Sequence, residues 1–386
     1  MAKGENAFVA WLARRYGPRP RGPDGVVAGI GDDMAILRLG ASGETSKRQN
    51  VETSKRETRK PKPESRKQKA EGRKPEGENP KSKIQNPKSS VLPSDTRHPT
   101  PDTRLLVTCD MLMDGVDFDT RIHTPAQIGR KALAVSLSDC AAMAVRPRWA
   151  VVSVALPESW TMARAKGLYL GMEPLAKRYG CRIVGGDTNS WRQGLVIDVT
   201  VLAEPWPDVR PVRRDGMLPG DVIMVSGPLG GSLAGHHLTF EPRVWEARWL
   251  AERLGEDLHA MMDLSDGLSV DGARMAAASG CGMELDVDAL AGSTRPAAEV
   301  KAGKRKRMQR VLNDGEDFEL LFAIAPHAVL KLMTPEAFPR FGDWPGPMWL
   351  TLGEAVSRRG VWAVHRDGKR VRRDRIEPKG WQHFVK

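Results

Sequence analysis

The sequence has few cysteines and no long apolar run. A transmembrane helix needs about 20 consecutive apolar residues, and no stretch of this kind is present. The four cysteines (Cys109, Cys140, Cys181 and Cys281) are far apart and form no CxxC pair, which argues against a disulfide framework and a structural zinc site. The N-terminus MAKGENAFVAWLARRYG lacks the apolar core of a signal peptide. We therefore expect a cytoplasmic protein with free thiols.

The sequence also lacks the side-chain arrangements used in covalent catalysis. No Ser-His-Asp or Cys-His pattern is visible, and the eight histidines are scattered. The glycine pair at Gly185-Gly186 resembles a strand-end loop that lets the backbone approach a phosphate. It has no following Lys-Ser pair, so it is not a P-loop.

The net charge of +12 comes mostly from one segment. Residues 41–100 contain 16 Lys and Arg against 8 Asp and Glu, which accounts for eight of the twelve charges. This segment has almost no apolar residues, so we predict a disordered basic insert at 41–103. It is either a tolerated loop insertion or an electrostatic tether to nucleic acid or an acidic partner. No aromatic residue interleaves with its charges, which favours the insertion and argues against a nucleic-acid partner. The basic run Lys301 to Arg310 is interpreted in the same way.

The first half of the chain alternates strand-like and helix-like segments. Without the insert, the apolar runs 34–39 and 104–112 become neighbours, which predicts a β-hairpin. Thr124, Pro125 and Gln127 predict a helix start with a capping box, and this helix should stop before Pro147. Further predicted elements are a strand at 149–157, a helix at 163–179, and strands at 181–187 and 194–203.

A Pro- and Arg-rich stretch at 205–219 is a plausible domain junction. We therefore predict two domains, 1–204 and 205–386. The second contains a predicted strand at 220–227, helical sequence to about residue 254, a helix from Ser265 to Ser279, and a strand at 318–324. Mixed strands and helices in both halves predict an α+β or mixed α/β architecture.

Short acidic motifs occur where apolar runs stop. They are GIGDD (to Asp33), VTCD (Asp110), SLSD (Asp139), IVGGD (Asp187), MDLSD (Asp263, Asp266) and NDGED (Asp314 to Asp317). A carboxylate at the end of a buried strand is costly unless a cation or a hydrogen-bond donor is near. Several together indicate Mg²⁺ ions that hold a polyphosphate. Asp139 is the sharpest case, because it lies inside an apolar helix.

These motifs also have purely structural interpretations. Asp33 is in a Gly-Asp-Asp sequence that is common in turns. Asp263 and Asp266 stand where a helix N-cap would be, and Asp there is favoured by the helix dipole. Glu316 and Asp317 fit a charged hairpin turn. From the residues alone, both interpretations stay open.

Taken in order, eight motifs resemble those of the thiamine-monophosphate kinases. These enzymes share a superfamily with aminoimidazole ribonucleotide synthetase, selenophosphate synthetase and a hydrogenase-maturation protein. The motifs are GIGDDMAIL, TCDMLMDGVDF, IGRKALAVSLSDCAAM, GGDTNS, VRRDGMLPGD, DLSDGLSVD, DGEDFELLF and KGWQHF. The resemblance implies an N-terminal α+β domain that forms a β-barrel-like dimer interface, followed by a C-terminal α/β domain. It implies a homodimer that transfers the γ-phosphoryl group of ATP to thiamine monophosphate.

The resemblance also implies the roles of individual residues. The magnesium positions are Asp33, Thr108, Cys109, Asp110, Asp139, Asp187, Asp263 and Asp266. The ATP positions are Tyr169, Gly186, Asp187, Arg214 and Ser265. The substrate positions are Asp117, Glu316 and Trp381, of which Trp381 suits a cationic aromatic ligand. We expect no catalytic residue beyond the metal and phosphate ligands, since a substrate phosphate is already ionised near neutral pH.

Three positions depart from the motifs of these kinases. Cys109 replaces a usual Thr, Asp117 replaces a usual His, and Asp314 replaces a usual Gly. The carboxylate of Asp117 should repel a phosphate unless it binds metal. The alternatives to the kinase are another ATP-dependent enzyme of the superfamily, similar to aminoimidazole ribonucleotide synthetase, and a non-catalytic relative tethered to nucleic acid.

Overall fold

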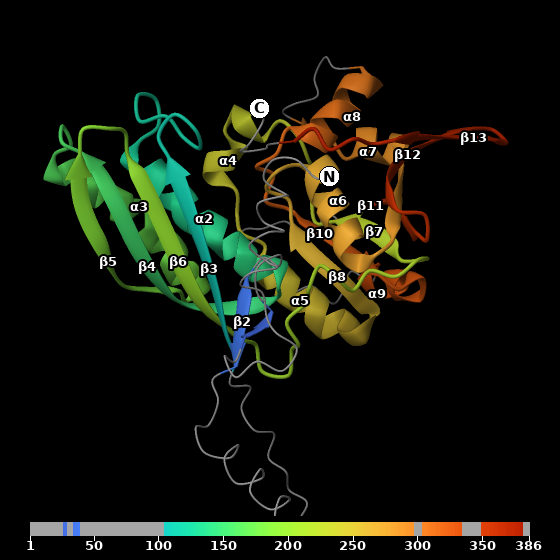
Figure 1. Cartoon of the computed structure of the whole chain (residues 1–386), viewed down its shortest axis with the longest axis horizontal. Coiled ribbons are helices and arrows are strands. Elements are labelled where there is room, and N and C mark those ends of the chain that lie inside the picture. The colour runs from blue at the N-terminus through green and yellow to red at the C-terminus, as the bar shows by residue number, and fades with distance from the viewer. Residues whose placement is uncertain (1–25, 29–33, 39–103, 297–302, 334–348, 381–386) are drawn as a thin grey trace, which may run out of the picture. The chain divides into compact units, whose positions relative to one another are not determined.

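The computed structural model describes residues 26–28, 34–38, 104–296, 303–333 and 349–380. Three predictions lie outside the described residues: the basic insert at 41–103, the metal candidate Asp33 and the substrate candidate Trp381. The described residues form two β-sheets, each with its own helices (Figure 1). None of the described helices is long and apolar enough to cross a lipid bilayer.

The first sheet has six strands in the order β1-β2-β3-β6-β4-β5. Among its described strands only β4 and β5 are parallel, and helix α3 connects them; all other neighbours are antiparallel. The strands are β1 (Val26–Ala28), β2 (Ala35–Arg38), β3 (Arg104–Met113), β4 (Val145–Pro157), β5 (Arg182–Trp191) and β6 (Val196–Pro205). Strands β2 and β3 pair with Arg38 opposite Arg104, which confirms the predicted hairpin.

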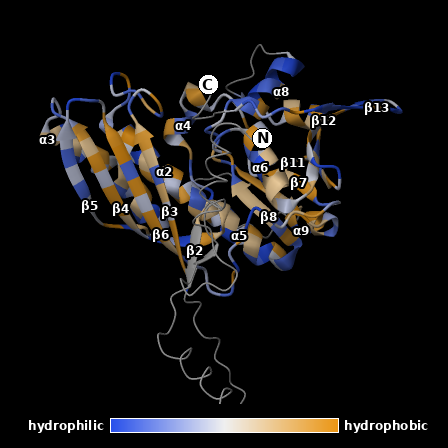
Figure 2. Ribbon diagram, in the orientation of Figure 1, coloured by the Kyte–Doolittle hydropathy of each residue, from blue (hydrophilic) through white to orange (hydrophobic). Residues whose placement is uncertain are grey.

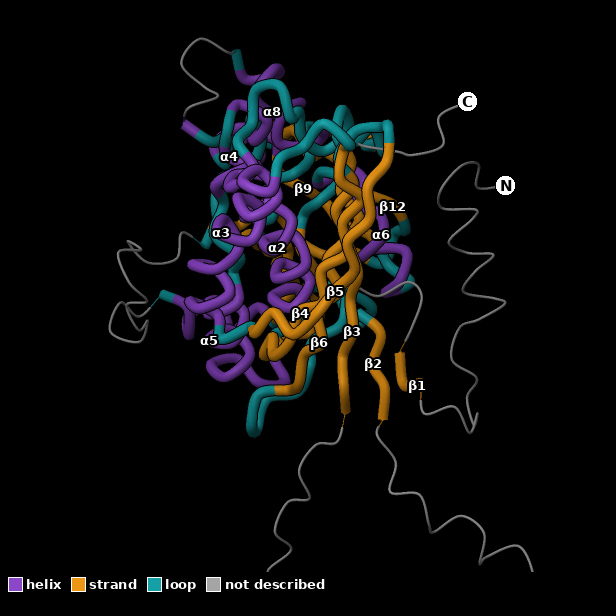
Figure 3. The backbone as a smooth tube through the Cα atoms, turned by 90° about the vertical axis from the view of Figure 1, so that its left-hand side faces the viewer, coloured by secondary structure: helices purple, strands orange, loops and turns teal. Residues whose placement is uncertain are grey.

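Helices α2 (Pro125–Ala142) and α3 (Met162–Tyr179) cover one face of the first sheet (Figure 3). The predicted capping box at the start of α2 is confirmed, because Thr124 and Gln127 each accept a hydrogen bond from the other's backbone N–H. The two helices touch at glycines. A Cβ atom on Gly129 would lie 2.0 Å from the carbonyl oxygen of Leu168, so only glycine allows this approach.

The second sheet has seven strands in the order β13-β12-β9-β11-β7-β10-β8, and β9 with β12 is its one parallel pair among the described strands. The strands are β7 (Val222–Val225), β8 (Leu258–Asp263), β9 (Gly282–Asp286), β10 (Leu320–Ile324), β11 (Leu350–Val356), β12 (Gly360–Asp367) and β13 (Arg370–Arg375). The helices are α4 (His236–Thr239), α5 (Val244–Leu254), α6 (Leu268–Ser279), α7 (Val287–Gly292), α8 (Lys304–Asn313) and α9 (Val329–Leu332).

Strand β10 is buried on both faces, as its unbroken apolar sequence predicts. Leu320, Phe322 and Ile324 join a core that also contains residues of α2 and the first sheet. Leu321 and Ala323 point the other way, into a second core with residues of α6 and β9. The apolar strands of both sheets stand out in Figure 2, whereas α8 and β13 are hydrophilic.

Helix α2 contacts both sheets. It packs on β3, β4 and β6 of the first sheet and on β8 of the second, and it also contacts α4 and α5. Side chains two positions apart on a helix point in nearly opposite directions, about 200° around the axis. This one helix can therefore present polar groups to both sheets, which is how the candidate site is assembled.

The fold differs from the predictions in four respects. Residues 304–310 of the basic run interpreted as a loop insertion belong to helix α8. Helix α6 begins at Leu268 after Gly267, whose φ is 98°, so neither Asp263 nor Asp266 is its N-cap. Strand β5 continues through Gly186 to Trp191, so the glycines are not in a strand-end loop. The second sheet is mostly antiparallel, so the C-terminal domain is α+β and not α/β. The two-domain architecture is confirmed, but the described strands form no closed barrel.

Candidate active site

Three serine and threonine hydroxyls each bond one of the acidic candidates. Ser136, on α2, donates to Asp110 of β3 over 2.8 Å. Ser138, two residues further along α2, donates to Asp263 at the end of β8 over 2.6 Å. Thr108 on β3 donates to Asp139 on α2. Strands from both sheets thus bring carboxylates to the same helix, Asp110 from within β3 and Asp263 from the end of β8. Sequence reasoning missed Ser136 and Ser138 as part of the site.

The carboxylates of Asp110 and Asp263 are close enough to repel each other. Burial raises the pKa of Asp110 to about 6; the hydrogen bond from Ser136 opposes this, and the charge of Asp263 adds to it. Burial also raises the pKa of Asp263, while Ser138 and the positive charge of Arg214 lower it. Two buried carboxylates with raised pKa values favour a cation between them.

The donor set suits a hard cation, since it consists of carboxylate and hydroxyl oxygens. Within the described ranges, however, no three His, Cys, Asp or Glu side chains converge as a bound metal ion would require. The hydroxyls of Thr108, Ser136 and Ser138 occupy carboxylate oxygens that a metal would otherwise contact.

Asp266 is held by an arginine beside the start of α6. Its carboxylate pairs with Arg274, which also contacts the fully buried Asp271 over 3.0 Å. The backbone N–H of Asp266 donates to Asp271 over 2.9 Å. This network fixes the turn that carries Ser265 and Asp266.

Cys109 and Asp187 lie on the opposite face of the first sheet from the Asp110 cluster. Side chains alternate along β3, so Cys109 points away from Asp110, and its thiol donates to Asp198 over 3.0 Å. Ser153 of β4 lies opposite Asp187 of β5 on one side and opposite Asp198 of β6 on the other, so the three side chains point to the same face. Asp187 is exposed there. Within one chain the fold therefore does not bring the Asp187 carboxylate to the Asp110 cluster.

Tyr169, the candidate for the adenine, lies on α3 at the wall of two cavities. One has a volume of about 530 Å³ and is lined partly by the end of α3 and the start of β5. The other, of about 360 Å³, is mainly apolar and is lined by Trp160, Leu168 and Thr188 among others. Thr188 follows Asp187 directly, but successive side chains of a strand point to opposite faces, so the Asp187 carboxylate lies on the face of the first sheet away from Tyr169.

A cavity of about 320 Å³ joins the metal and substrate candidates of the two domains. Its walls include Asp110 and Asp117 from the first domain and Ser265, Asp266 and Glu316 from the second. It also includes Lys131, which sequence reasoning missed because it lies within the apolar run KALAV. The Nζ atom of Lys131 lies 2.6 Å from Oε1 of Glu316.

The two substrate candidates have defined environments. The carboxylate of Asp117 accepts a hydrogen bond from the backbone N–H of Met113 over 2.7 Å, which closes the turn after β3. Burial raises the pKa of Glu316, and the charge and hydrogen bond of Lys131 lower it. The N–H of Glu316 donates to the carbonyl oxygen of Ser265 over 2.7 Å, so a substrate candidate and an ATP candidate are directly linked.

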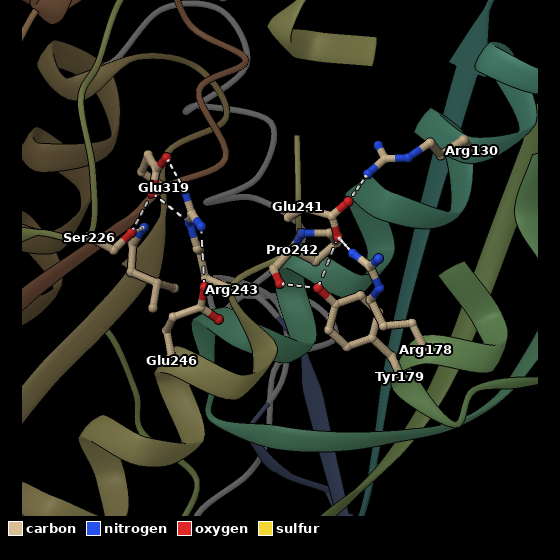
Figure 4. Close-up of polar contacts among 10 residues, drawn as sticks. Arg130, Arg178, Tyr179, Ser226, Glu241, Pro242, Arg243, Glu246 and Glu319 are labelled. Atoms are coloured by element: carbon tan, nitrogen blue, oxygen red, sulfur yellow. Dashed lines mark hydrogen bonds and ion pairs between the residues drawn. The ribbon is translucent and has the colours of Figure 1, made fainter. Parts of the chain in front are cut away.

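Ion pairs fix the segment between α4 and α5 against both domains (Figure 4). Glu241 accepts from Arg130 of α2 and from Arg178 of α3, each over 2.7 Å. Arg243 donates to the buried Glu319 of the second domain over 2.7 Å. These contacts hold the second domain to the helices of the first, next to the candidate site.

The chain matches known proteins over both domains. Residues 90–204 match the family model of the AIR synthase related protein, N-terminal domain, and residues 219–339 match its C-terminal domain. A thiamine-monophosphate kinase from Rhodopirellula baltica is 36% identical over 294 residues, which cover 75% of this chain and 87% of that protein. Another, from Aquifex aeolicus, is 31% identical and covers 73% of this chain and 88% of that protein.

A solved structure agrees with these matches. AaThiL complexed with AMPPCP and TMP superimposes with a TM-score of 0.58 at 28% identity, covering 73% of this chain and 87% of that chain. Family models, whole-length relatives and the superposition all describe the same two-domain enzyme. The chain therefore belongs to the thiamine-monophosphate kinase family, and it contains both AIR synthase related domains.

Proposed function

We propose that this chain phosphorylates thiamine monophosphate to thiamine diphosphate, using ATP and several Mg²⁺ ions in a direct in-line transfer. The observation that carries the proposal is the 320 Å³ cavity, in which the metal candidates Asp110 and Asp266 face the substrate candidate Glu316. The relatives named above support the substrate, since AaThiL was solved with AMPPCP and TMP.

Asp110 and Asp266, which line this cavity, would hold Mg²⁺ and the polyphosphate together with residues that the sequence motifs add. The proposed ligands are Asp110, Asp139, Asp263 and Asp266, together with Asp33, Asp187, the Thr108 hydroxyl and the backbone of Cys109. Bound Mg²⁺ would neutralise the phosphoryl oxygens and align them. Arg214, whose charge already acts on Asp263, would add a fixed positive charge. Ser265, Gly186 and Tyr169 are proposed to contact ATP.

Other residues of this cavity would hold the acceptor. Glu316 and Asp117 are the proposed substrate contacts. Trp381 is a third proposed contact, which rests on the sequence motifs alone. One carboxylate oxygen of Asp117 is bonded to the N–H of Met113 and the Lys131 ammonium lies against its carbonyl oxygen, so the repulsion of a phosphate is reduced. The acceptor phosphate is itself the nucleophile and is already ionised near neutral pH, so the proposed transfer requires no general base.

We also propose a homodimer in which the first sheets of two copies form a barrel-like interface, with the domains dividing near residues 204–205. The face of the sheet away from the helices carries Met111 and Met113, whose side chains are 62% and 42% exposed. The same face carries Asp187, so a second copy would cover it. Sedimentation equilibrium should give a dimer, and Met111→Glu with Met113→Glu should give a monomer. Val371→Glu on strand β13, where the valine is 43% exposed, is the matched control.

The kinase assay tests the activity itself. Purified protein with ATP, MgCl₂ and thiamine monophosphate should form thiamine diphosphate, measured by liquid chromatography, and EDTA should abolish the reaction. ATP hydrolysis without thiamine diphosphate would favour another ATP-dependent member of the superfamily. An absence of turnover at every Mg²⁺ concentration would refute the proposal.

A further inference from the structure

Lys131 is a fully buried lysine in the middle of α2. Its Nζ atom donates to Oε1 of Glu316 over 2.6 Å and to the backbone oxygen of Asp117 over 2.5 Å. A buried ammonium is costly unless it is paired and hydrogen-bonded. Both of its partners are substrate candidates, and they belong to different domains. The lysine therefore connects the two substrate contacts across the cavity.

The charge balance of the cavity depends on Lys131. Among the described residues that line the 320 Å³ cavity, Lys131 is the one basic side chain. The acidic lining residues are Asp110, Asp117, Asp266, Asp314 and Glu316. The ammonium is in direct contact with the Glu316 carboxylate and offsets part of the repulsion that Asp117 and Asp266 exert on it.

The backbone of Glu316 adopts a conformation that needs support. Its φ is 50°, in the left-handed region that is unfavourable for a non-glycine residue. Gly315 before it also has a positive φ, of 69°. The N–H of Glu316 is held by the Ser265 carbonyl, and its side chain is held by Lys131. The contact with Lys131 thus fixes the direction in which the carboxylate points.

Only one oxygen of Glu316 is used by Lys131. Among the described residues, no hydrogen-bond donor contacts Oε2 of Glu316, and this residue borders the cavity. A carboxylate oxygen can accept from an N–H group of a ligand, and its charge attracts a ring cation. The acceptor proposed above has an aminopyrimidine and a thiazolium ring, so it offers both.

We propose that Lys131 is a positioning residue for the acceptor: its buried ammonium holds the Glu316 carboxylate against the turn after β3 and aims Oε2 at the amino group of the cationic acceptor. This inference rests on the proposed kinase function. Lys131 acts through Glu316 and does not touch the reacting phosphates.

The first test is Lys131→Met, which removes the ammonium and keeps most of the side-chain volume. The KM for thiamine monophosphate should rise about 10- to 100-fold, the range for losing a hydrogen bond to a charged group. The KM for ATP should stay within about two-fold of wild type, since the ATP candidates do not contact Lys131. Lys331→Met is the matched control, because Lys331 forms a 2.7 Å pair with Asp257 on the exposed surface.

A second variant separates positioning from direct contact and guards against misfolding of the first. Glu316→Gln should raise the KM for thiamine monophosphate by a similar factor. Adding Lys131→Met to Glu316→Gln should change this KM by less than about three-fold, since the lysine acts through the carboxylate.

Three outcomes would overturn the inference. They are an unchanged KM for thiamine monophosphate in Lys131→Met, an unchanged value in Glu316→Gln, and a full additional loss in the double variant. The last would mean that Lys131 acts on the ligand directly. An inactive wild-type enzyme would overturn the kinase proposal as well, whereas an active wild type with insensitive variants would overturn this inference alone.

Discussion

The buried Glu319 gives the sharpest test of how the segment between α4 and α5 is held to the rest of the second domain. Its carboxylate is 1% exposed and accepts from Arg243 over 2.7 and 2.8 Å and from Ser226 over 2.6 Å (Figure 4). Glu319→Gln keeps the shape of the side chain but removes its charge. Among the described residues, Glu246 at 3.2 Å then remains as a charged partner of Arg243.

The size of the effect follows from burial. Breaking a buried ion pair by removing one partner costs about 3–5 kcal/mol, because the other charge is left poorly compensated. The remaining contact with Glu246 puts the expected loss near the lower end, at about 3 kcal/mol. Glu252→Gln is the matched control. Glu252 pairs with Arg248 over the same 2.7 Å, but the two side chains are 43% and 37% exposed, so the loss should be about 0.3–0.5 kcal/mol.

Urea unfolding followed by far-UV circular dichroism measures both losses, and pH adds a second check. Burial alone would raise the pKa of Glu319, but the charge and hydrogen bonds of Arg243 lower it below the ordinary 4.5. A lowered pKa stabilises the fold above the unfolded value and stops doing so as pH falls through the folded value. The difference between wild type and Glu319→Gln should therefore be constant above about pH 5 and shrink in more acidic solution. Equal losses for Glu319→Gln and Glu252→Gln at neutral pH would refute this reasoning.

Three further predictions concern the site and the insert. Asp139→Asn should reduce kinase turnover to below about 1% of the wild-type value, since Asp139 is proposed as a metal ligand. The free energy of unfolding should stay within about 1 kcal/mol of wild type. A collapse of stability with full activity per folded molecule would contradict the assignment. The affinity of the nucleotide-free protein for Mg²⁺, measured by calorimetry, should fall as pH drops below about 6, because protons compete for Asp110 with its raised pKa; a pH-independent affinity would argue against this site. Deleting residues 41–100 should leave kinase turnover within about two-fold of the full-length protein. Steep, salt-dependent RNA binding that is lost on deletion would instead support the insert as a tether to nucleic acid.

The local parts of the fold could be predicted from the sequence. The start of α2 is set by Thr124 and Gln127, which are neighbours in sequence and satisfy each other. The hairpin of β2 and β3 could be predicted because two apolar runs are separated only by the insert, whose sequence has almost no apolar residues. The acidic motifs could be recognised because a carboxylate directly after an apolar run is costly to bury without a cation or a donor beside it.

The parts of the site that depend on long-range contacts could not be predicted. Lys131 and Glu316 are separated by 185 positions, and nothing near KALAV indicates that its lysine has a partner. Ser136 and Ser138 are ordinary helix residues until α2 is placed between two sheets. Alternation along β3 predicts that Cys109 and Asp110 face opposite ways, but only the packing of α2 decides which of them faces the cluster.

The same holds for the sheet of the second domain. The sequences of β8 and β10 are apolar runs that would suit parallel or antiparallel neighbours equally. The DLSD motif offers a cap at Ser265 or Asp266, which would place Gly267 inside the helix. The φ of Gly267, 98°, instead makes a turn, and the helix begins one residue later.

The pairing of Arg38 with Arg104 has a practical consequence for protein engineering. These two residues are neighbours in the sheet although the whole insert lies between them in sequence. A chain break inside the insert would leave β1 and β2 on one polypeptide and the rest of the described fold on another. Each piece would carry one strand of the hairpin, so the two could reassociate by strand complementation. The insert is thus a natural place to split this enzyme into halves whose reunion restores a measurable activity.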